Sequence, residues 1–215
     1  MKTVAVDAMG GDHAPGAIVD GAVAAARELG IPVILCGRED VIARELRRHP
    51  TEGLPLRVVH ATEVVQMGDH PVEALRRKLD NSMRVALERV HAGEAAAFVS
   101  AGNSGAAMAT AVMVLGNLAG VDRPAIALEI PSKQNPVILL DAGANVDCAP
   151  INLVQFAVMG DALARTIRGV RAPRIGLLSN GEEDSKGTET TRAAAQALRQ
   201  MRLNFVGYIE GRDIN

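Results

Sequence analysis

Apolar runs of strand length alternate with helix-like segments along most of the chain. Eight of these runs are almost continuously apolar, and most are rich in Val, Ile or Leu, which is typical of strands covered on both faces. A pattern of this kind predicts parallel strands rather than antiparallel strands with one solvent-exposed face. The eight predicted strands lie at residues 3–8, 32–37, 56–61, 95–101, 125–130, 136–143, 174–181 and 205–210.

Helices are predicted between most of these strands. The alternation predicts an α/β fold, an open and mainly parallel twisted sheet with helices on both faces. We find no internal repeat, low-complexity tract or Ser/Gly linker, so we expect residues 1–215 to form a single α/β region. One predicted helix begins after Pro15 and ends near Gly30, and another follows Gly37. The segment 71–92 is predicted to form one or two helices. The remaining predicted helices lie at 104 to about 119, about 150–168 and about 187–202.

The composition narrows the class of protein. Of the 215 residues, 48% are hydrophobic and 22% charged, an ordinary balance for a globular protein. A net charge of −2 with three Phe, one Tyr and no Trp argues against nucleic acid as a partner. Cys36 and Cys148 are far apart with no CxxC spacing, which predicts neither a zinc site nor a disulfide framework and favours the cytoplasm. No signal peptide or membrane-spanning run is predicted.

Glycine-rich turns follow four of the predicted strands. Ligands of open α/β sheets bind beyond the carboxyl ends of the strands, so a binding site is expected at these turns. A single glycine there is explained by a tight turn, but four turns that combine Gly with Asn, Asp or Ser predict a shared site. The turns read "DAMGGDHAP" (7–15), "SAGNSGAA" (100–107), "DAGANVDC" (141–148) and "SNGEEDSKGTE" (179–189).

The second of these turns predicts an anion site. Ser104 and Gly105 open a helix whose free backbone N–H groups, with the helix dipole, attract negative charge. Ser100, Asn103 and Ser104 add uncharged hydrogen-bond donors. The combination suits a phosphate or an oxyanion.

Three better-known catalytic or nucleotide motifs are not favoured. Gly102-x-Ser104 resembles half of a nucleophile elbow, but Ala106 stands where the second glycine belongs. All five histidines precede Ser104, so the base that this class places after the serine is missing. The chain also lacks a P-loop, and "DAMGGDHA" does not fit G-x-G-x-x-G.

Five motifs together resemble a known family. In chain order they are "VAVDAMGGDHAP", "SAGNSGA", "DRPAIA", "LLDAGANVDC" and "GLLSNGEEDSKG", and they are similar to the PlsX family, the phosphate acyltransferases of bacterial phospholipid synthesis. Ser104 stands where the family commonly has Thr. "KLDNSM" replaces "KKxSSM", so Lys78 and Ser82 match while Leu79 and Asn81 differ. Family chains continue beyond the position of Asn215, so we expect this chain to be about their N-terminal two-thirds.

The resemblance implies a reaction, a fold and partners. Inorganic phosphate would attack the thioester of an acyl carrier protein carrying a fatty acyl chain, which needs no Ser–His pair and no cofactor. The implied fold is Rossmann-like, of the isocitrate-dehydrogenase and phosphotransacetylase type. Family membership also implies a cytoplasmic homodimer whose full-length form associates with the membrane surface.

The chemistry needs groups that hold a phosphate dianion and stabilise an oxyanion. Lys186 and Arg123 are the candidate cations, although exposed charges explain them equally well. Asp7 and Asp12 are predicted to orient donors, or one of them to take a proton. Two alternatives stay open: Asp12 caps the following helix, or Asp7, Asp12 and His13 bind a metal.

The full set of candidate residues falls into two groups. The catalytic candidates are Asp7, Asp12, Asn103 and Lys186. The candidates for binding phosphate and substrate are Gly10, Gly11, Ser82, Ser100, Gly102, Ser104, Gly105, Arg123, Gly143, Asn145, Asn180 and Gly181.

Other functions and two structural expectations accompany this hypothesis. A phosphotransacetylase-like or nicotinamide-dependent enzyme of similar architecture, and a non-catalytic binding module, remain alternatives. The segment 104–119 is apolar all round, which predicts burial in the core or in a subunit interface. We expect the sheet to continue beyond residue 215, and the chain by itself to bind phosphate weakly and to lack acyl transfer.

Overall fold

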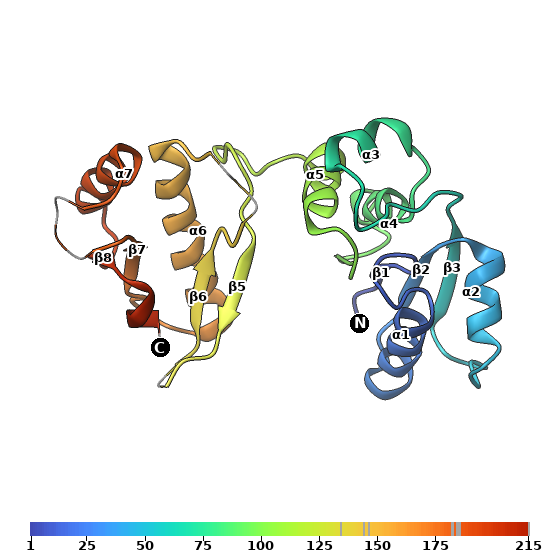
Figure 1. Cartoon of the computed structure of the whole chain (residues 1–215). Coiled ribbons are helices and arrows are strands. Elements are labelled where there is room, and N and C mark those ends of the chain that lie inside the picture. Colours follow the sequence, from blue (N-terminus) through green and yellow to red (C-terminus); the bar gives the residue numbers. More distant parts are fainter. Residues whose placement is uncertain (134, 144, 146, 182, 184–185, 215) are drawn as a thin grey trace. The chain divides into compact units, whose positions relative to one another are not determined.

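The computed structural model of the protein describes residues 1–133, 135–143, 145, 147–181, 183 and 186–214. Its contacts divide the chain into two compact units, residues 1–117 and residues 118–215. Each unit contains both strands and helices (Figure 1). The single α/β region expected over residues 1–215 stays a prediction.

The first unit is built on a four-stranded parallel sheet with the strand order β3-β2-β1-β4. In the register of this sheet, Val6 of β1 lies between Leu35 of β2 and Val99 of β4. The elements of the unit are β1 (Val4–Asp7), α1 (Gly16–Leu29), β2 (Val33–Gly37), α2 (Glu39–Leu46), β3 (Leu56–His60), α3 (Pro71–Arg77), α4 (Ser82–His91), β4 (Ala97–Val99) and α5 (Ser104–Leu115).

Neighbouring residues of a strand supply the cores on the two faces of this sheet. Side chains alternate between the faces along a strand. Val6 therefore packs with Val19 of α1 and Ile42 of α2 on one face. Ala5 packs with Ala86 of α4 on the other. Helices thus cover both faces, which explains why β1 and β2 consist almost entirely of apolar residues and confirms the predicted sheet type.

In its described residues, the second unit contains two two-stranded sheets and the helices α6 and α7. Strands β7 and β8 pair in parallel, whereas β5 and β6 pair antiparallel. The elements are β5 (Ala127–Ile130), β6 (Val137–Leu140), α6 (Pro150–Arg168), β7 (Ile175–Leu178), α7 (Glu189–Arg199), β8 (Phe205–Ile209) and a short 3₁₀ turn, η1 (Gly211–Ile214).

The antiparallel pair is an exception within the predicted sheet, which was expected to be mainly parallel. A parallel pair needs a crossover of roughly a dozen residues or more, but only residues 131–136 connect β5 to β6. The short connection therefore forces a hairpin, although both strands carry the apolar runs that are typical of parallel sheets.

All eight predicted strands are confirmed, with shorter bounds, and so are the predicted helices. The segment 71–92 forms two helices, α3 and α4. Helix α5 ends at Leu115, earlier than predicted, because Gly116 follows it with a φ of 76°. Helix α7 begins at Glu189, with Thr188 as its N-cap.

Helix α5 is less buried than its composition predicts. Only Ala106 and Thr110 of this helix are buried, while Met113 and Leu115 are 49% and 44% exposed. Burial in the core is therefore wrong for most of the helix, and a subunit interface stays a prediction. Among the described helices, none is both long enough and apolar enough to cross a membrane.

Candidate functional site

The turns after β1 and β4 meet at the point where the strand order reverses. From β1 the chain goes to β2 and β3 on one side of the sheet and then returns to β4 on the other side. The turns that leave β1 and β4 thus diverge, which opens the crevice where ligands of such sheets bind. Two of the four turns singled out in the sequence are therefore brought together, as predicted. The other two belong to the second unit, and their convergence with the first two stays a prediction.

A buried carboxylate joins these two turns. Asp7 is only 1% exposed, and both of its oxygens accept hydrogen bonds. Oδ1 accepts from the Met9 backbone N–H at 3.1 Å, and Oδ2 accepts from Ser100 Oγ at 2.7 Å. Ser100 Oγ in turn accepts from the Gly102 backbone N–H at 3.1 Å. Asp7 therefore fixes the shape of both turns from beneath.

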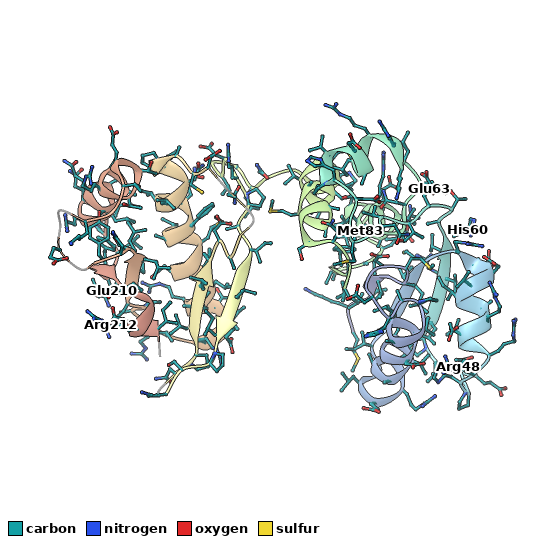
Figure 2. The ribbon with its side chains drawn as sticks, viewed as in Figure 1. Arg48, His60, Glu63, Met83, Glu210 and Arg212 are labelled. Atoms are coloured by element: carbon teal, nitrogen blue, oxygen red, sulfur yellow. The ribbon has the colours of Figure 1, made fainter. Side chains whose placement is uncertain are left out.

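Glycines let the two turns approach each other. A Cβ on Gly10 would lie 2.3 Å from Asp7 Oδ2, which is far inside van der Waals contact. A Cβ on Gly102 would lie 3.2 Å from the Gly10 Cα and 2.5 Å from the Met83 methyl carbon. Met83, labelled in Figure 2, is fully buried and has little room to move away. Gly11 has a φ of 108°, which a side chain would also strain.

Asp12 lies at the surface, unlike Asp7. Both Asp12 and His13 are exposed. Helix α1 has Pro15 as its N-cap and no capping side chain, so the alternative that Asp12 caps this helix is wrong. No group of three or more His, Cys, Asp or Glu side chains among the described residues is placed to hold a metal ion. Asp7 is therefore buried beneath the turns, whereas Asp12 lies on their surface.

Asp12 lines an open pocket of about 640 Å³ at the carboxyl edge of the sheet. Its walls come from residues within the turn 9–14, from Arg38 after β2, and from residues within 64–68 after β3. Three neighbouring parallel strands therefore end at one pocket. Arg38 and the segment 64–68 were not among the predicted site residues, because no glycine-rich motif marks these positions after their strands.

Asn103 holds one wall of this pocket in place. Its Oδ1 accepts from the Ala106 backbone N–H at 2.9 Å and so caps α5. Its Nδ2 donates to the backbone oxygens of Met67 at 3.0 Å and Asp69 at 3.1 Å. The neighbouring Ser104 is exposed, and Gly105 lies close enough to Pro71 that a Cβ would approach it to 3.0 Å.

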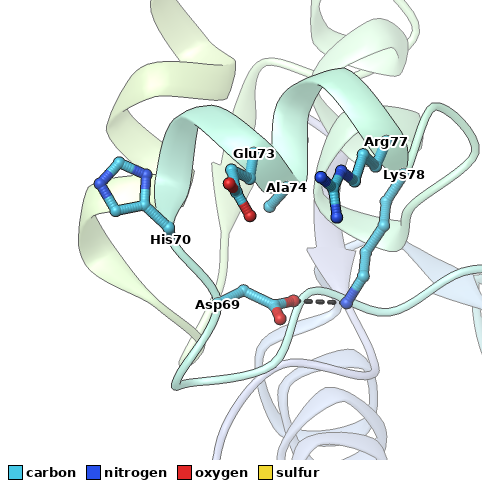
Figure 3. Close-up of a pocket in the computed structure, with 6 residues that line it drawn as sticks. All are labelled: Asp69, His70, Glu73, Ala74, Arg77 and Lys78. Atoms are coloured by element: carbon cyan, nitrogen blue, oxygen red, sulfur yellow. Dashed lines mark hydrogen bonds and ion pairs between the residues drawn. The ribbon is translucent and has the colours of Figure 1, made fainter.

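An ion pair fixes the same segment from its other side. Figure 3 shows Lys78 extending from the end of α3 to Asp69. Lys78 Nζ also donates to the Val64 oxygen at 2.8 Å, while Asp69 Oδ2 accepts from the Gln66 backbone N–H at 2.8 Å. The hydrogen bond from Lys78 lowers the pKa of Asp69. Lys78, noted in the sequence only for its family resemblance, thus shapes the segment 64–69.

Ser82 and the small pocket beside α3 belong to the same region. Ser82 is buried at the start of α4, and its backbone N–H donates to the Glu63 oxygen at 3.2 Å. The pocket holds about 140 Å³ and is lined by His70, Glu73 and Arg77 together with the Asp69–Lys78 pair (Figure 3). Ser82 lies inside the packing rather than on the pocket wall.

In the second unit, Asp141 organises the turn after β6. Its φ of 65° is unusual for a residue with a side chain. Asp141 Oδ1 accepts from the backbone N–H and the Nδ2 of Asn145, at 3.2 and 3.1 Å. Asn145 Nδ2 also donates to the Pro124 oxygen at 2.9 Å. Gly143, with a φ of 91°, lies in this turn, whose residues 144 and 146 are outside the described part of the chain.

Both candidate cations belong to the second unit. Arg123 is exposed, and its Nη1 donates to the Asp147 oxygen at 2.8 Å. Lys186 is exposed and lies over Gly181, where a Cβ would come within 2.8 Å of its Cγ. Lys186 precedes the N-cap of α7 by two residues, so it lies just before the helix N-terminus. Asn180 Oδ1 accepts from the Gly187 backbone N–H at 3.2 Å. Residues 182, 184 and 185 of this turn are outside the described residues.

Neither thiol has the environment of an activated nucleophile. Burial raises the pKa of Cys36 to about 12. Burial, followed by the nearby Asp141 carboxylate, also raises the pKa of Cys148. Both cysteines are free, and a raised pKa keeps them as thiols near neutral pH. An external nucleophile therefore suits this chain better than a cysteine of its own.

Comparison with known proteins identifies the family. A family described as "Fatty acid synthesis protein" matches residues 2–215. The phosphate acyltransferase of Anaeromyxobacter sp. (strain K) is 59% identical over 212 residues, which cover 98% of this chain and 58% of the relative. That of Geobacter sulfurreducens is 56% identical over 211 residues, covering 98% and 61%. The chain belongs to the fatty acid synthesis protein family. The resemblance to phosphate acyltransferases that the motifs predicted is thus confirmed.

Solved structures show the fold of this family member. A phosphotransacetylase from Streptococcus pyogenes matches with a TM-score of 0.71 at 16% identity, over 97% of this chain and 68% of that chain. The EutD phosphotransacetylase from Staphylococcus aureus matches with a TM-score of 0.62 at 18% identity and the same coverage. The phosphotransacetylase-like α/β fold is confirmed. The family member described here spans about three-fifths of the length of the curated relatives named above.

Proposed function

We propose that the protein takes part in transferring an acyl group from an acyl carrier protein to inorganic phosphate. A phosphate oxygen attacks the thioester carbonyl carbon, the C–S bond breaks, and the sulfur leaves and takes a proton to become the free thiol of the carrier. The product is an acyl phosphate, which would feed phosphatidic acid and phospholipid synthesis. The observation that carries this proposal is 54–59% identity, over 98% of the chain, to proteins named phosphate acyltransferase.

The arrangement of the first unit supports a site with an external nucleophile. Asp7 keeps the turns after β1 and β4 in one shape, so their backbone donors are oriented before any ligand binds. Donors fixed in advance stabilise a developing oxyanion without a further cost of reorganisation. We assign the oxyanion to the start of α5, where the Ser104 hydroxyl and the Gly105 N–H lie.

The two candidate cations would hold the phosphate. Both are exposed. Arg123 donates to the Asp147 oxygen of the turn 141–148, and Lys186 belongs to the turn 179–189; the Asn and Gly residues of these two turns add amide and backbone donors. Arg123 offers a planar set of donors that matches phosphate, whereas Lys186 supplies a mobile point charge. Gly143, Asn145, Asn180 and Gly181 accompany them as proposed phosphate-binding residues.

Asp12, rather than Asp7, is the carboxylate proposed to exchange a proton. Both oxygens of the buried Asp7 already accept hydrogen bonds from its own turns. Asp12 is exposed at the pocket, where a substrate would lie within its reach. A general base must touch the proton that it takes, so exposure favours Asp12.

Assembly and location form part of the same proposal. We propose a homodimer that works in the cytoplasm and whose full-length form associates with the membrane surface. At the end of α5 the large apolar side chains of Met113 and Leu115 are exposed, which supports a subunit contact around that end of the helix.

A second candidate function keeps the reaction and changes the carrier. Solved phosphotransacetylases share this fold, with a TM-score of 0.71, and we propose an acyl-coenzyme A thioester as the alternative donor. The two candidates differ only in what carries the thiol, so one assay separates them.

The assay measures free thiol as the phosphate concentration is raised, with acyl carrier protein or acyl-coenzyme A as donor. It is run on this chain and on a chimera in which the chain replaces the matching residues of the Anaeromyxobacter relative. We expect the chimera to release carrier thiol in proportion to phosphate, and the chain by itself to be far less active. A folded chimera that releases no thiol from either donor, beside an active relative, contradicts the proposal.

A further inference from the structure

We infer that the 640 Å³ pocket at the ends of β1, β2 and β3 binds the 4′-phosphopantetheine arm that carries the acyl thioester, with Arg38 on its phosphate. This inference rests on the proposed function, because it names the part of the donor that the first unit recognises. Acyl carrier proteins and coenzyme A share this arm, which consists of a phosphate, a hydroxyl, two amides and a terminal thiol.

Arg38 is the cation of this pocket. It is the N-cap residue of α2, and its side chain is half exposed. Among the described residues its guanidinium contacts Asp40 alone, through one long hydrogen bond of 3.4 Å. Asp40 also accepts from Arg44 at 3.2 Å, so its charge is shared. A guanidinium has five N–H donors, and most of those on Arg38 remain available for a phosphate.

Thioether side chains form the apolar part of the wall. Met9 lies against Gly37, where a Cβ would come within 2.5 Å of its Cγ. The missing side chain at Gly37 therefore makes the space that Met9 occupies, directly beside Arg38. Met67, on the facing segment, is 51% exposed. Methionine side chains adapt to a slender flexible ligand better than branched ones do.

The remaining polar groups match the middle of the arm. Asp12 and Gln66 line the pocket, and both are exposed. The Gln66 side-chain amide can accept from the hydroxyl and amide N–H groups of the arm and donate to its carbonyls, which leaves Asp12 for the thioester end. One cation for one phosphate, and neutral or accepting groups elsewhere, is the charge pattern that this ligand requires.

The wall formed by residues 64–68 is in place before any ligand binds. Asn103 bonds the Met67 and Asp69 oxygens, and Lys78 bonds the Val64 oxygen. Because the segment is fixed at both ends, little conformational entropy is lost when a ligand settles against it. The bonds of Asn103 also connect this wall to the start of α5, the proposed oxyanion site.

The test follows the methyl signals of selectively labelled methionines by NMR as 4′-phosphopantetheine is added to this chain. We expect the Met9 and Met67 signals to move, and those of Met1, Met113 and Met201 to stay. Pantetheine, which lacks the phosphate, should bind about fivefold to tenfold more weakly, the difference that one charge-assisted contact makes at an exposed site.

Arg38→Ala should abolish this preference, so that both probes bind with equal dissociation constants. Arg44→Ala is the matched control, since it removes the other partner of Asp40 but lies outside the pocket, and it should keep the preference. Gly37→Ala should displace Met9 and weaken both probes alike. Holo-carrier protein and coenzyme A, compared in the same titration, assign the source of the arm, and binding of either at the Met9 signal supports the site.

Binding is read without turnover, so its failure and the failure of the proposed function are distinguishable. If Met9 and Met67 do not respond to millimolar 4′-phosphopantetheine, or if Arg38→Ala keeps the preference, the inference is overturned whatever the thiol assay shows. If the signals respond while the chimera transfers no acyl group to phosphate, the arm site stands and the reaction is wrong.

Discussion

Similar apolar runs are covered differently in the two units. All five residues of β2 are buried between α1, α2 and α4, and the parallel sheet around it shows apolar side chains to both faces. In the second unit, β5 has no buried residue, and Leu128 and Leu178 are each 46% exposed. An apolar run thus predicts a strand in both units, but burial on both faces follows only for the central strands β1 and β2, because β3 and β4 at the edges of the first sheet have no buried residue either.

The candidate site residues differ in the same way. In the first unit, Asp7 and Asn103 hold their turns through several hydrogen bonds each, and Asp7 is buried. In the second unit, Arg123 and Lys186 are exposed side chains. Hydrogen bonds therefore hold these two candidates of the first unit in place, whereas the two candidate cations of the second unit lie at its surface. This contrast predicts that substitutions of Asp7 and Asn103 lower stability, whereas substitutions of Arg123 and Lys186 leave stability nearly unchanged.

The largest effect is expected for Asp7→Ala. It leaves the Met9 N–H and the Ser100 hydroxyl without their acceptor in a buried site, which should lower the free energy of unfolding by about 3 kcal/mol. Asp141→Ala, in a half-exposed turn of the second unit, should cost about 1 kcal/mol. Hydrogen exchange over residues 1–117 and 118–215 measures each unit separately. Equal losses in the two units would contradict the comparison.

A pair of glycines sharpens the same contrast. Gly10→Ala brings a Cβ against the buried Asp7 carboxylate and should destabilise the first unit by about 2 kcal/mol. Gly181→Ala meets only the exposed side chains of Glu183 and Lys186, which can rotate away, and should cost less than about 0.5 kcal/mol. Gly21→Ala, in open space within α1, controls for the added methyl group and should be neutral or stabilising in urea unfolding.

Asn103 and Ser104 separate stability from turnover at the start of α5. Asn103→Ala removes the helix cap and two contacts to the segment 64–69, and should cost about 1 to 2 kcal/mol. The exposed Ser104→Ala should change stability by less than about 0.5 kcal/mol. Turnover of the chimera should nevertheless fall about tenfold or more with Ser104→Ala, if its hydroxyl donates to the oxyanion. Full activity of the Ser104→Ala variant would show that the oxyanion is bound elsewhere.

The smallest effect concerns Asp69 and depends on pH. Lys78 lowers the pKa of the folded Asp69 below its ordinary value, so the pair stabilises the ionised form. Its contribution is complete above about pH 4, the unfolded pKa, and is lost as the pH falls through the lower folded value. Asp69→Asn should therefore cost up to about 0.5 kcal/mol at pH 7, because the pair is partly exposed. Urea unfolding at pH 7 and pH 3 should show this difference shrinking in acid; a constant difference would assign it to another cause.

Local pattern was enough to predict the elements and the meeting of the first two turns. Strand order was not predictable, because it depends on connections rather than on apolar runs, and β5–β6 became a hairpin through the short segment 131–136. The different fates of Asp7 and Asp12 depend on strand register, which buries the last residue of β1 and leaves the turn exposed. Arg38 and Asp69 belong to no recognisable sequence motif. The place of Arg38 in the pocket and the pairing of Asp69 with Lys78 are evident only in the folded structure.

In the proposed reaction, inorganic phosphate itself attacks the acyl thioester. The most direct measurement gives the chimera inorganic phosphate labelled with ¹⁸O in all four positions and identifies the acyl product by mass. We expect an acyl phosphate that retains all four labelled oxygens, one of them bridging to the acyl carbon, and that forms at the same rate as the free carrier thiol. Release of thiol at the same rate without phosphate, with an unlabelled fatty acid as the product, would show that water is the nucleophile and would contradict the claim.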